Sequence, residues 1–262
     1  MAKADGYDDF LLDLDGVIYL NKQPIPDGIE FVERLREMGK GVLFLTNNSR
    51  YTREEYREKL QDMGIEAHEE EFITSSVTTA AFLQENYDLE RKTAYYIGGL
   101  GLEEALSGTD LTLLRGEEGS DADFVVVGWD KELTYDKLRI ATVALHSGAF
   151  FVATNHDATF PVPGGLWPGA GSIVAALETA AGREALVIGK PNTYMIQVAM
   201  SGTGGKVDKT LMVGDRLETD ILGGWRAGLD TCLVLTGVAT REDLEGFDPQ
   251  PDLVVESLLE LL

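Results

Sequence analysis

The chain has 262 residues, and its 45 acidic residues outnumber its 22 lysines and arginines, which gives a formal charge of −23. Apolar residues make up 44% of the sequence, which is enough for a folded core and too much for a disordered chain. So negative a charge argues against a nucleic-acid partner and against binding to an anionic membrane, because both require clustered basic residues. No apolar run approaches the roughly 20 residues that span a bilayer.

The compartment is indicated by the cysteine content and by the N-terminal segment. The single Cys232 cannot form an intrachain disulfide or a cysteine metal cage, which fits a reducing interior. The N-terminal segment has no cationic start followed by an apolar stretch, so we expect no signal peptide and a cytoplasmic protein. The acidity has two explanations that stay open, a highly solvated surface or adaptation to high salt, where ions would screen the self-repulsion.

The N-terminal third alternates short apolar runs with helical patterns. Strands are expected over residues 10–12, 41–45 and 71–74, and helices over 27–38, where Asp27 is the expected N-cap, and 53–63. Strand, helix and strand in this rhythm predict right-handed crossovers and a parallel sheet.

The alternation of strand and helix patterns is less regular in the middle of the chain and becomes regular again near its end. Further strands are expected over 93–97, 110–114, 123–128 and 149–154, and then over 186–188, 211–213 and 232–235. The simplest interpretation is an α/β core formed by residues 1–86 and 184–262, interrupted by a second domain over residues 87–183.

Two acids follow the first predicted strand. Asp13 and Asp15 lie two residues apart, so their side chains point to the same side of the chain. The end of a parallel strand opens onto the crevice where such sheets bind ligands. Two carboxylates at ~4 Å repel each other by about 4 kcal/mol at an effective dielectric of 20, so such a pair shares a proton or recruits a cation.

A second pair of acids follows a later strand. Asp215 comes directly after the run that ends in Val213-Gly214, and Asp220 follows one helical turn later. Together with Asp13 and Asp15 they form a set of oxygen ligands that suits Mg²⁺ and not zinc.

Groups suited to a phosphate lie at two other strand ends. Thr46 offers a hydroxyl and Asn47 a backbone N–H, and Lys190 supplies a point charge for phosphoryl oxygens. Taken alone, each of these residues could equally serve a turn, a cap or the solvated surface. Together with the acids they indicate phosphoryl transfer, in which positioning and charge neutralisation dominate catalysis.

Four ordered motifs of the chain resemble those of the haloacid dehalogenase superfamily. They are Asp13-Leu14-Asp15-Gly16-Val17, Thr46-Asn47-Asn48-Ser49, Gly189-Lys190-Pro191 and Gly214-Asp215-Arg216-Leu217-Glu218-Thr219-Asp220. The subclass that they indicate is the NagD-like phosphatases with a class IIA cap. The resemblance covers essentially the whole chain and implies a Rossmann-like, three-layer parallel-sheet core with an inserted α/β cap over residues 87–183.

The resemblance also implies a mechanism and a role for each motif residue. Asp13 would attack phosphorus and form an aspartyl-phosphate, and Asp15 would protonate the leaving alcohol and then activate water. Asp13, the backbone carbonyl of Asp15 and Asp215 would hold Mg²⁺, with Asp220 bonding directly or through the waters of the metal. The phosphoryl oxygens would be held by Thr46, Asn47 and Lys190.

The cap is expected to select the substrate. Asn155, His156 and Asp157 follow the strand at 149–154 and are candidate specificity residues, although an Asx-type turn explains them equally well. For Trp129 and Trp167, burial in a packed core is the preferred interpretation over a place in a pocket.

The leading hypothesis is therefore a Mg²⁺-dependent phosphatase that acts on a small phosphorylated metabolite, such as a sugar phosphate or a nucleoside monophosphate. Three alternatives stay open: a non-catalytic, receiver-like phosphoacceptor module, a phosphomutase, and a dehalogenase of the same superfamily. Asp15 and the pair Asp215 and Asp220 disfavour the dehalogenase, because hydrolytic dehalogenation needs no metal. Relatives often pair through their caps, which leaves a homodimer open.

Overall fold

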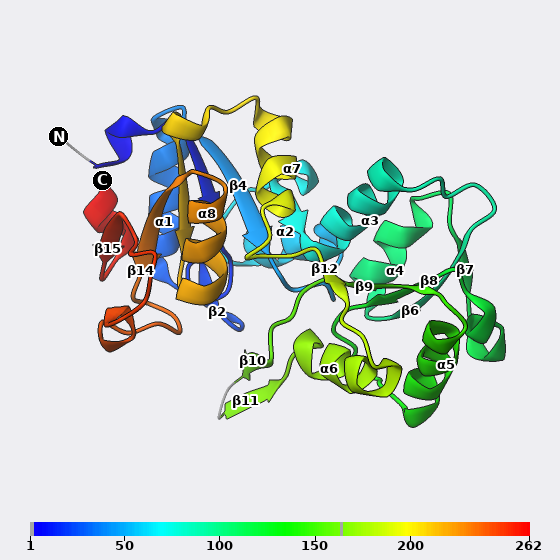
Figure 1. Cartoon of the computed structure of the whole chain (residues 1–262). Helices are drawn as coiled ribbons and strands as arrows, with labels where there is room; N and C mark the ends of the chain where they lie inside the picture. The colour runs from blue at the N-terminus through cyan, green and yellow to red at the C-terminus, as the bar shows by residue number, and fades with distance from the viewer. Residues whose placement is uncertain (1–2, 163–164) are drawn as a thin grey trace. The chain divides into compact units, whose positions relative to one another are not determined.

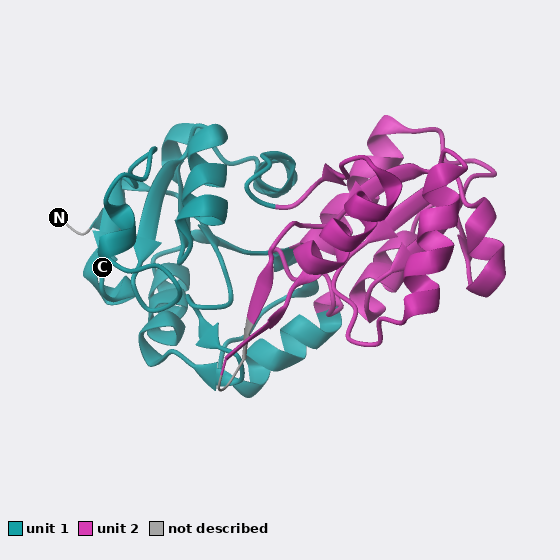
Figure 2. Ribbon diagram, turned by 60° about the horizontal axis from the view of Figure 1, so that its bottom comes forward, with its two compact units in different colours: residues 1–46, 54–73, 190–262 teal, residues 47–53, 74–189 magenta. Residues whose placement is uncertain are grey.

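The computed structural model describes residues 3–162 and 165–262, and it divides into two compact units (Figures 1 and 2). Unit 1 comprises residues 1–46, 54–73 and 190–262, and unit 2 comprises residues 47–53 and 74–189. The predicted cap at residues 87–183 lies within unit 2, which begins earlier and also takes in the short segment 47–53. None of the described helices is both long and apolar enough to cross a membrane.

Unit 1 is built on a six-stranded sheet with the order β15-β14-β13-β1-β4-β5. Its strands are β1 (Asp9–Leu12), β4 (Gly41–Thr46), β5 (Phe72–Thr74), β13 (Thr210–Gly214), β14 (Asp230–Val234) and β15 (Leu253–Val255). Its helices are α1 (Pro26–Glu37), α2 (Arg53–Asp62), α7 (Tyr194–Thr203) and α8 (Leu222–Arg226). The small hairpin of β2 (Tyr19–Leu20) and β3 (Gln23–Pro24) follows β1.

Helices cover both faces of this sheet because neighbouring residues of β1 point to opposite sides. The ring of Phe10 packs edge-on against Phe31 of α1, with 5.8 Å between the centroids. The next residue, Leu11, belongs to an apolar cluster with Met195 and Ile196 of α7. The core is thus a three-layer α/β arrangement, as predicted (Figure 1).

Unit 2 has its own sheet, in which five parallel strands run in the order β12-β9-β8-β6-β7. These strands are β6 (Thr93–Ile97), β7 (Thr112–Leu114), β8 (Phe124–Val127), β9 (Phe150–Ala153) and β12 (Leu186–Val187). The helices are α3 (Ser75–Asn86), α4 (Leu100–Ser107), α5 (Tyr135–His146) and α6 (Ala170–Ala181), and β10 (Thr159–Val162) pairs with β11 (Gly165–Pro168). Helices α5 and α6 bury their apolar side chains against β8 and β9.

The predicted start of α1 is wrong by about two residues. The helix begins at Pro26, with Ile25 as its extended N-cap, and Asp27 lies inside the first turn. Proline is well suited to the first helical position, because it needs no hydrogen-bond acceptor there and its φ angle is already helical. The Asp27 carboxylate instead accepts a hydrogen bond from the Ser257 hydroxyl.

Candidate active site

Three ends of neighbouring strands in unit 1 place the predicted site residues at one edge of the sheet. Strand β1 lies between β4 and β13 and is parallel to both, so that Leu12 is level with Phe44 and Val213. The parallel ladder continues one step beyond β1, where the backbone N–H of Asp13 donates to the Val213 carbonyl at 2.9 Å. Asp13, Thr46 and Asp215 therefore follow or end three adjacent strands.

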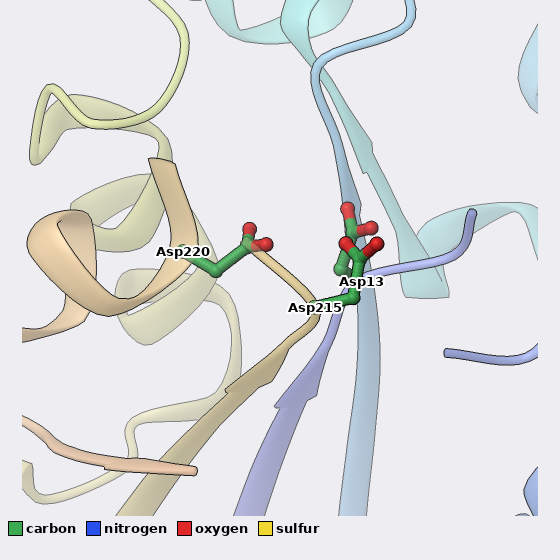
Figure 3. A group of neighbouring side chains, drawn as sticks. All are labelled: Asp13, Asp215 and Asp220. Atoms are coloured by element: carbon green, nitrogen blue, oxygen red, sulfur yellow. The ribbon is translucent and has the colours of Figure 1, made fainter. Parts of the chain in front are cut away.

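Three carboxylates converge at this edge (Figure 3). Asp13, Asp215 and Asp220 each present an oxygen atom within 4.8 Å of the other two, and all three side chains are largely buried. Asp220 comes from the π-helical turn η5 (Leu217–Ile221), which directly follows β13 and Asp215. Carboxylates from two distant stretches of the chain thus form one cluster.

Backbone groups orient the two later acids. The N–H of Val238 donates to Asp215 Oδ2 at 2.7 Å, and the N–H of Arg216 donates to Asp220 Oδ2 at 3.1 Å. The other oxygen of Asp215, Oδ1, is buried and has no hydrogen-bond partner among the described residues. A buried carboxylate oxygen without a donor is costly, so this atom is suited to bind a cation.

Lys190 supplies the one ammonium group that contacts these carboxylates in the described part of the chain. Its Nζ atom lies 2.7 Å from Asp13 Oδ1 and 2.6 Å from Asp220 Oδ1, and it donates to the Leu45 carbonyl at 3.1 Å. The side chain is only 2% exposed. Burial by itself lowers the pKa of Lys190, but the charges of Asp13 and Asp220 outweigh burial and raise this pKa.

The cluster contains three carboxylates and one ammonium, and this excess of acids contributes to raised pKa values of Asp13 and Asp215. Burial raises the pKa of Asp13 well above its usual range, and the neighbouring Asp220 and Asp215 raise it further against the opposing effect of Lys190. Burial, together with Asp220, raises the pKa of Asp215 to about 7. Three carboxylates beside one ammonium favour a bound divalent cation, and an all-oxygen donor set fits Mg²⁺.

Asp15 lies in the turn that follows Asp13. The next residue, Gly16, has a φ of +87°, and a Cβ atom built on it would lie 2.3 Å from Asp215 Oδ2, so only glycine fits here. Burial raises the pKa of Asp15 to about 6, against the opposing effects of Lys59, Tyr19, Arg216 and Lys190. A carboxyl group that gains and loses its proton near neutral pH is suited to acid–base chemistry.

The predicted phosphate-binding residues fall in both units. Thr46 ends β4 in unit 1 and is buried, and Lys190 belongs to the same unit. Asn47 belongs to unit 2, where its side chain donates to Asp157 Oδ1 at 3.1 Å. The roles of all three toward a phosphate stay predictions.

Two of the three predicted cap residues bind the segment that carries Asn47. The Asn155 side chain is 3% exposed and donates to the Asn47 carbonyl at 2.6 Å. The same carbonyl accepts a hydrogen bond from the Ser75 hydroxyl at 2.6 Å. His156 is separate from this group: its side chain is half exposed, and Nε2 lies 3.4 Å from Glu178 Oε2 on α6.

Sequence reasoning missed two residues beside Asp15, namely Tyr19 and Lys59. The Lys59 ammonium lies 3.2 Å from the centre of the Tyr19 ring. A signal for Lys59 was present, because it flanks the buried face that Tyr56 and Leu60 form on an otherwise charged helix. No pattern in the sequence indicates which ring this lysine covers.

Comparison with known proteins gives matches along nearly the whole chain. A profile described as haloacid dehalogenase-like hydrolase matches residues 10–112, and a second, described as HAD-hydrolase-like, matches residues 187–261. The 5'-nucleotidase YutF of Bacillus subtilis is 39% identical over 256 residues, which cover 97% of each chain.

Solved structures match over the same extent. A glycerol phosphate phosphatase from Mycobacterium tuberculosis, solved in complex with magnesium, is 32% identical with a TM-score of 0.93, and the match covers 100% of this chain and 78% of that one. NagD from Escherichia coli K-12 is 29% identical with a TM-score of 0.89, and the match covers 98% of this chain and 99% of that one.

Proposed function

Because the chain belongs to the haloacid dehalogenase-like hydrolases and is a phosphatase, we propose that it hydrolyses a small phosphomonoester with the help of Mg²⁺ and through an aspartyl-phosphate on Asp13. The observation that carries this proposal is the convergence of the Asp13, Asp215 and Asp220 carboxylates, two of which, Asp13 and Asp220, contact the ammonium of Lys190. This arrangement provides a nucleophile, a cation site and a positive charge for the phosphoryl group at one edge of the sheet.

The metal would be held by the carboxylates of Asp13, Asp215 and Asp220, together with the backbone carbonyl of Asp15. The unpartnered Oδ1 atom of Asp215 and the excess of negative charge support this assignment. When bound, Mg²⁺ supplies neutralisation of the negative charge on the phosphoryl oxygens.

Asp13 is proposed as the nucleophile. One of its carboxylate oxygens attacks phosphorus, a new O–P bond forms, and the bond between phosphorus and the ester oxygen breaks. Lys190 lies within 2.7 Å of Asp13 Oδ1 and would attract the phosphoryl oxygens as a fixed charge. The Thr46 hydroxyl would contribute a further donor in unit 1, and the role of the Asn47 backbone N–H toward the phosphate stays a prediction.

Asp15 is proposed as the general acid and base. In the first step its carboxyl proton passes to the ester oxygen, so that the alcohol leaves as a neutral molecule. In the second step the Asp15 carboxylate takes a proton from the water that attacks the aspartyl-phosphate, and inorganic phosphate is released while Asp13 is restored. A pKa near 6 supports both roles.

For the substrate we propose a small phosphorylated metabolite, such as a sugar phosphate or a nucleoside monophosphate. Two of the matched proteins carry names that refer to substrates of this size, a 5'-nucleotidase and a glycerol phosphate phosphatase. The candidate specificity residues Asn155, His156 and Asp157 stay predictions.

The proposal is tested by following inorganic phosphate while the purified protein acts on a panel of phosphorylated metabolites. Steady release that depends on Mg²⁺, together with transient phosphorylation that maps to Asp13, supports it. A stable phosphoprotein without turnover would favour a phosphoacceptor module, and isomerisation of a sugar phosphate without net release would favour a mutase.

A further inference from the structure

A lysine lies over an aromatic ring next to the proposed acid and base of unit 1. The Lys59 side chain extends from α2, and its Nζ atom lies 3.2 Å from the centre of the Tyr19 ring. The Tyr19 residue is fully buried, whereas Lys59 is partly buried. Among residues 3–162 and 165–262, no carboxylate lies within ion-pair distance of Lys59, and its ammonium contacts the Tyr19 ring.

Tyr19 closes the turn that carries Asp15. The backbone N–H of Gly16 donates to the Tyr19 carbonyl at 2.8 Å, and Asp15 and Tyr19 form an isolated β-bridge. The Ile18 N–H donates to the Leu14 carbonyl at 2.9 Å, which tightens the same turn. The backbone of Tyr19 is thus bonded to the turn that carries Asp15, so a shift of Tyr19 would displace this turn.

The charges agree with this geometry. Burial lowers the pKa of Lys59 to about 8, with a further lowering from Lys22, while Asp15 opposes the shift. Lys59 is likewise the strongest charge that favours the ionised form of Asp15. A partly buried ammonium is costly, and a neutral side chain of similar length would avoid this cost, so a structural role alone gives no reason for a lysine here.

We infer that Lys59 is a positioning residue for Asp15: its ammonium holds the Tyr19 ring, and thereby the turn that presents the Asp15 carboxyl group to the leaving oxygen. The inference rests on the proposed role of Asp15 as the acid that gives its proton to the ester oxygen while the P–O bond breaks. Lys59 itself does not touch the reacting atoms in this account.

The loss of activity caused by a misplaced Asp15 should depend on the leaving group of the substrate. An alkoxide is a poor leaving group and needs the proton from Asp15, whereas p-nitrophenolate is a stable anion and leaves without it. Both substrates share the second step, in which Asp15 acts as the base, so the comparison uses kcat/KM, which reports only the steps up to the transfer of the phosphoryl group to Asp13. Misplacement of Asp15 should lower kcat/KM far more for an alkyl ester such as glycerol phosphate than for p-nitrophenyl phosphate.

The test compares both substrates at saturating Mg²⁺ for the full chain and its variants. For Lys59→Met we expect kcat/KM on glycerol phosphate to fall about tenfold, the scale of a partly desolvated cation–ring contact, with at most about a threefold loss of kcat/KM on p-nitrophenyl phosphate. Lys59→Arg should restore most of the loss, because arginine also binds aromatic faces. Arg57→Met, on the same helix, is the matched control and should behave as the wild type, because Arg57 pairs with Gln61 and Glu58.

Further variants distinguish a failure of this inference from a failure of the proposed function. Tyr19→Leu removes the ring together with a side chain that favours the ionised form of Asp15, so it should show a selective loss at least as large as that of Lys59→Met. Adding Lys59→Met to it should cost little more, since the contact between the ammonium and the ring is already lost. An equal loss of kcat/KM on both substrates for Lys59→Met, or an arginine variant no better than the methionine variant, would overturn the positioning role. Lys59→Gln serves in the same assay if the methionine variant does not fold. Asp15→Asn is measured alongside: a selective loss there with none at Lys59 overturns only this inference, whereas an unselective Asp15→Asn overturns the proposed acid as well.

Discussion

Two buried polar groups of this chain differ in how their charges are balanced. In unit 1, three carboxylates lie together with a single ammonium, that of Lys190; they belong to Asp13, Asp215 and Asp220. The Oδ1 atom of Asp215 has no hydrogen-bond donor in the described structure. In unit 2, Asn155 and Asp157 hold the segment at Asn47 through hydrogen bonds: the Asn155 amide donates to the Asn47 carbonyl, and the Asp157 carboxylate accepts from the Asn47 amide. An imbalance of charge indicates that a ligand belongs in the first group, whereas the second is already complete and fits a structural role.

The largest effect should follow from removing the nucleophile of the unbalanced group. Asp13→Asn should reduce turnover by a factor on the order of 10⁴ to 10⁶, as in other enzymes that lose a covalent nucleophile. The variant should fold normally, because a neutral amide relieves repulsion among the carboxylates. Phosphate release and thermal melting check the two parts, and an activity near that of the wild type would exclude Asp13 as the nucleophile.

Removal of the metal should have an effect of similar size. EDTA should abolish phosphate release, and excess Mg²⁺ should restore it. Binding to the folded state alone also stabilises it, so Mg²⁺ should raise the melting temperature of the wild type. Asp215→Asn should lose this gain while its metal-free melting temperature stays equal or rises. A protein that is indifferent to EDTA would contradict the metal assignment.

A smaller loss is expected for the acid and base. Asp15→Asn should slow the hydrolysis of an alkyl phosphate by ~10²–10⁴-fold, the usual contribution of a general acid or base. Steady-state kinetics with glycerol phosphate measure the effect. If kcat fell by less than about threefold, another group would have to supply the proton.

The sequence predicts those site residues whose position follows from a local pattern, such as the end of a parallel strand. The strand ends at Asp13, Thr46 and Asp215 were predictable, because apolar runs identify parallel strands and parallel strands align their ends. The π-helical turn that brings Asp220 back to Lys190 was not predictable from spacing alone, although the motif resemblance included both residues.

Other features depend on contacts between distant residues, which no local pattern reveals. Trp129 is buried, as predicted, and its ring packs against that of Phe160 with 4.5 Å between the centroids. Trp167 is 49% exposed, so its predicted burial is wrong. Trp167 lies on β11 of the β10–β11 pair, which was not predicted at all and leaves this side chain outside the core. Lys59 and Tyr19 are forty residues apart in sequence, and only the fold brings them together.

The smallest effects should come from the complete polar group of unit 2. Asn155→Ala should lower the free energy of unfolding by about 1–3 kcal/mol, because it leaves part of a buried hydrogen-bond network unmatched. His156→Ala, at an exposed neighbouring position, is the control and should change it by less than about 0.5 kcal/mol. Urea unfolding measures both. A stability that is unchanged in Asn155→Ala, together with altered substrate preference, would show that this group also serves recognition.

The most direct test of the central claim is a crystal structure of the protein with Mg²⁺ and beryllium fluoride, which mimics a phosphoryl group on a carboxylate. The account predicts the fluoride adduct on Asp13, with Mg²⁺ bound by Asp13 and Asp215 and with the Lys190 ammonium beside the fluorine atoms. A Mg²⁺ ion bound elsewhere, or an unmodified Asp13 with Lys190 directed away from the adduct, would contradict it.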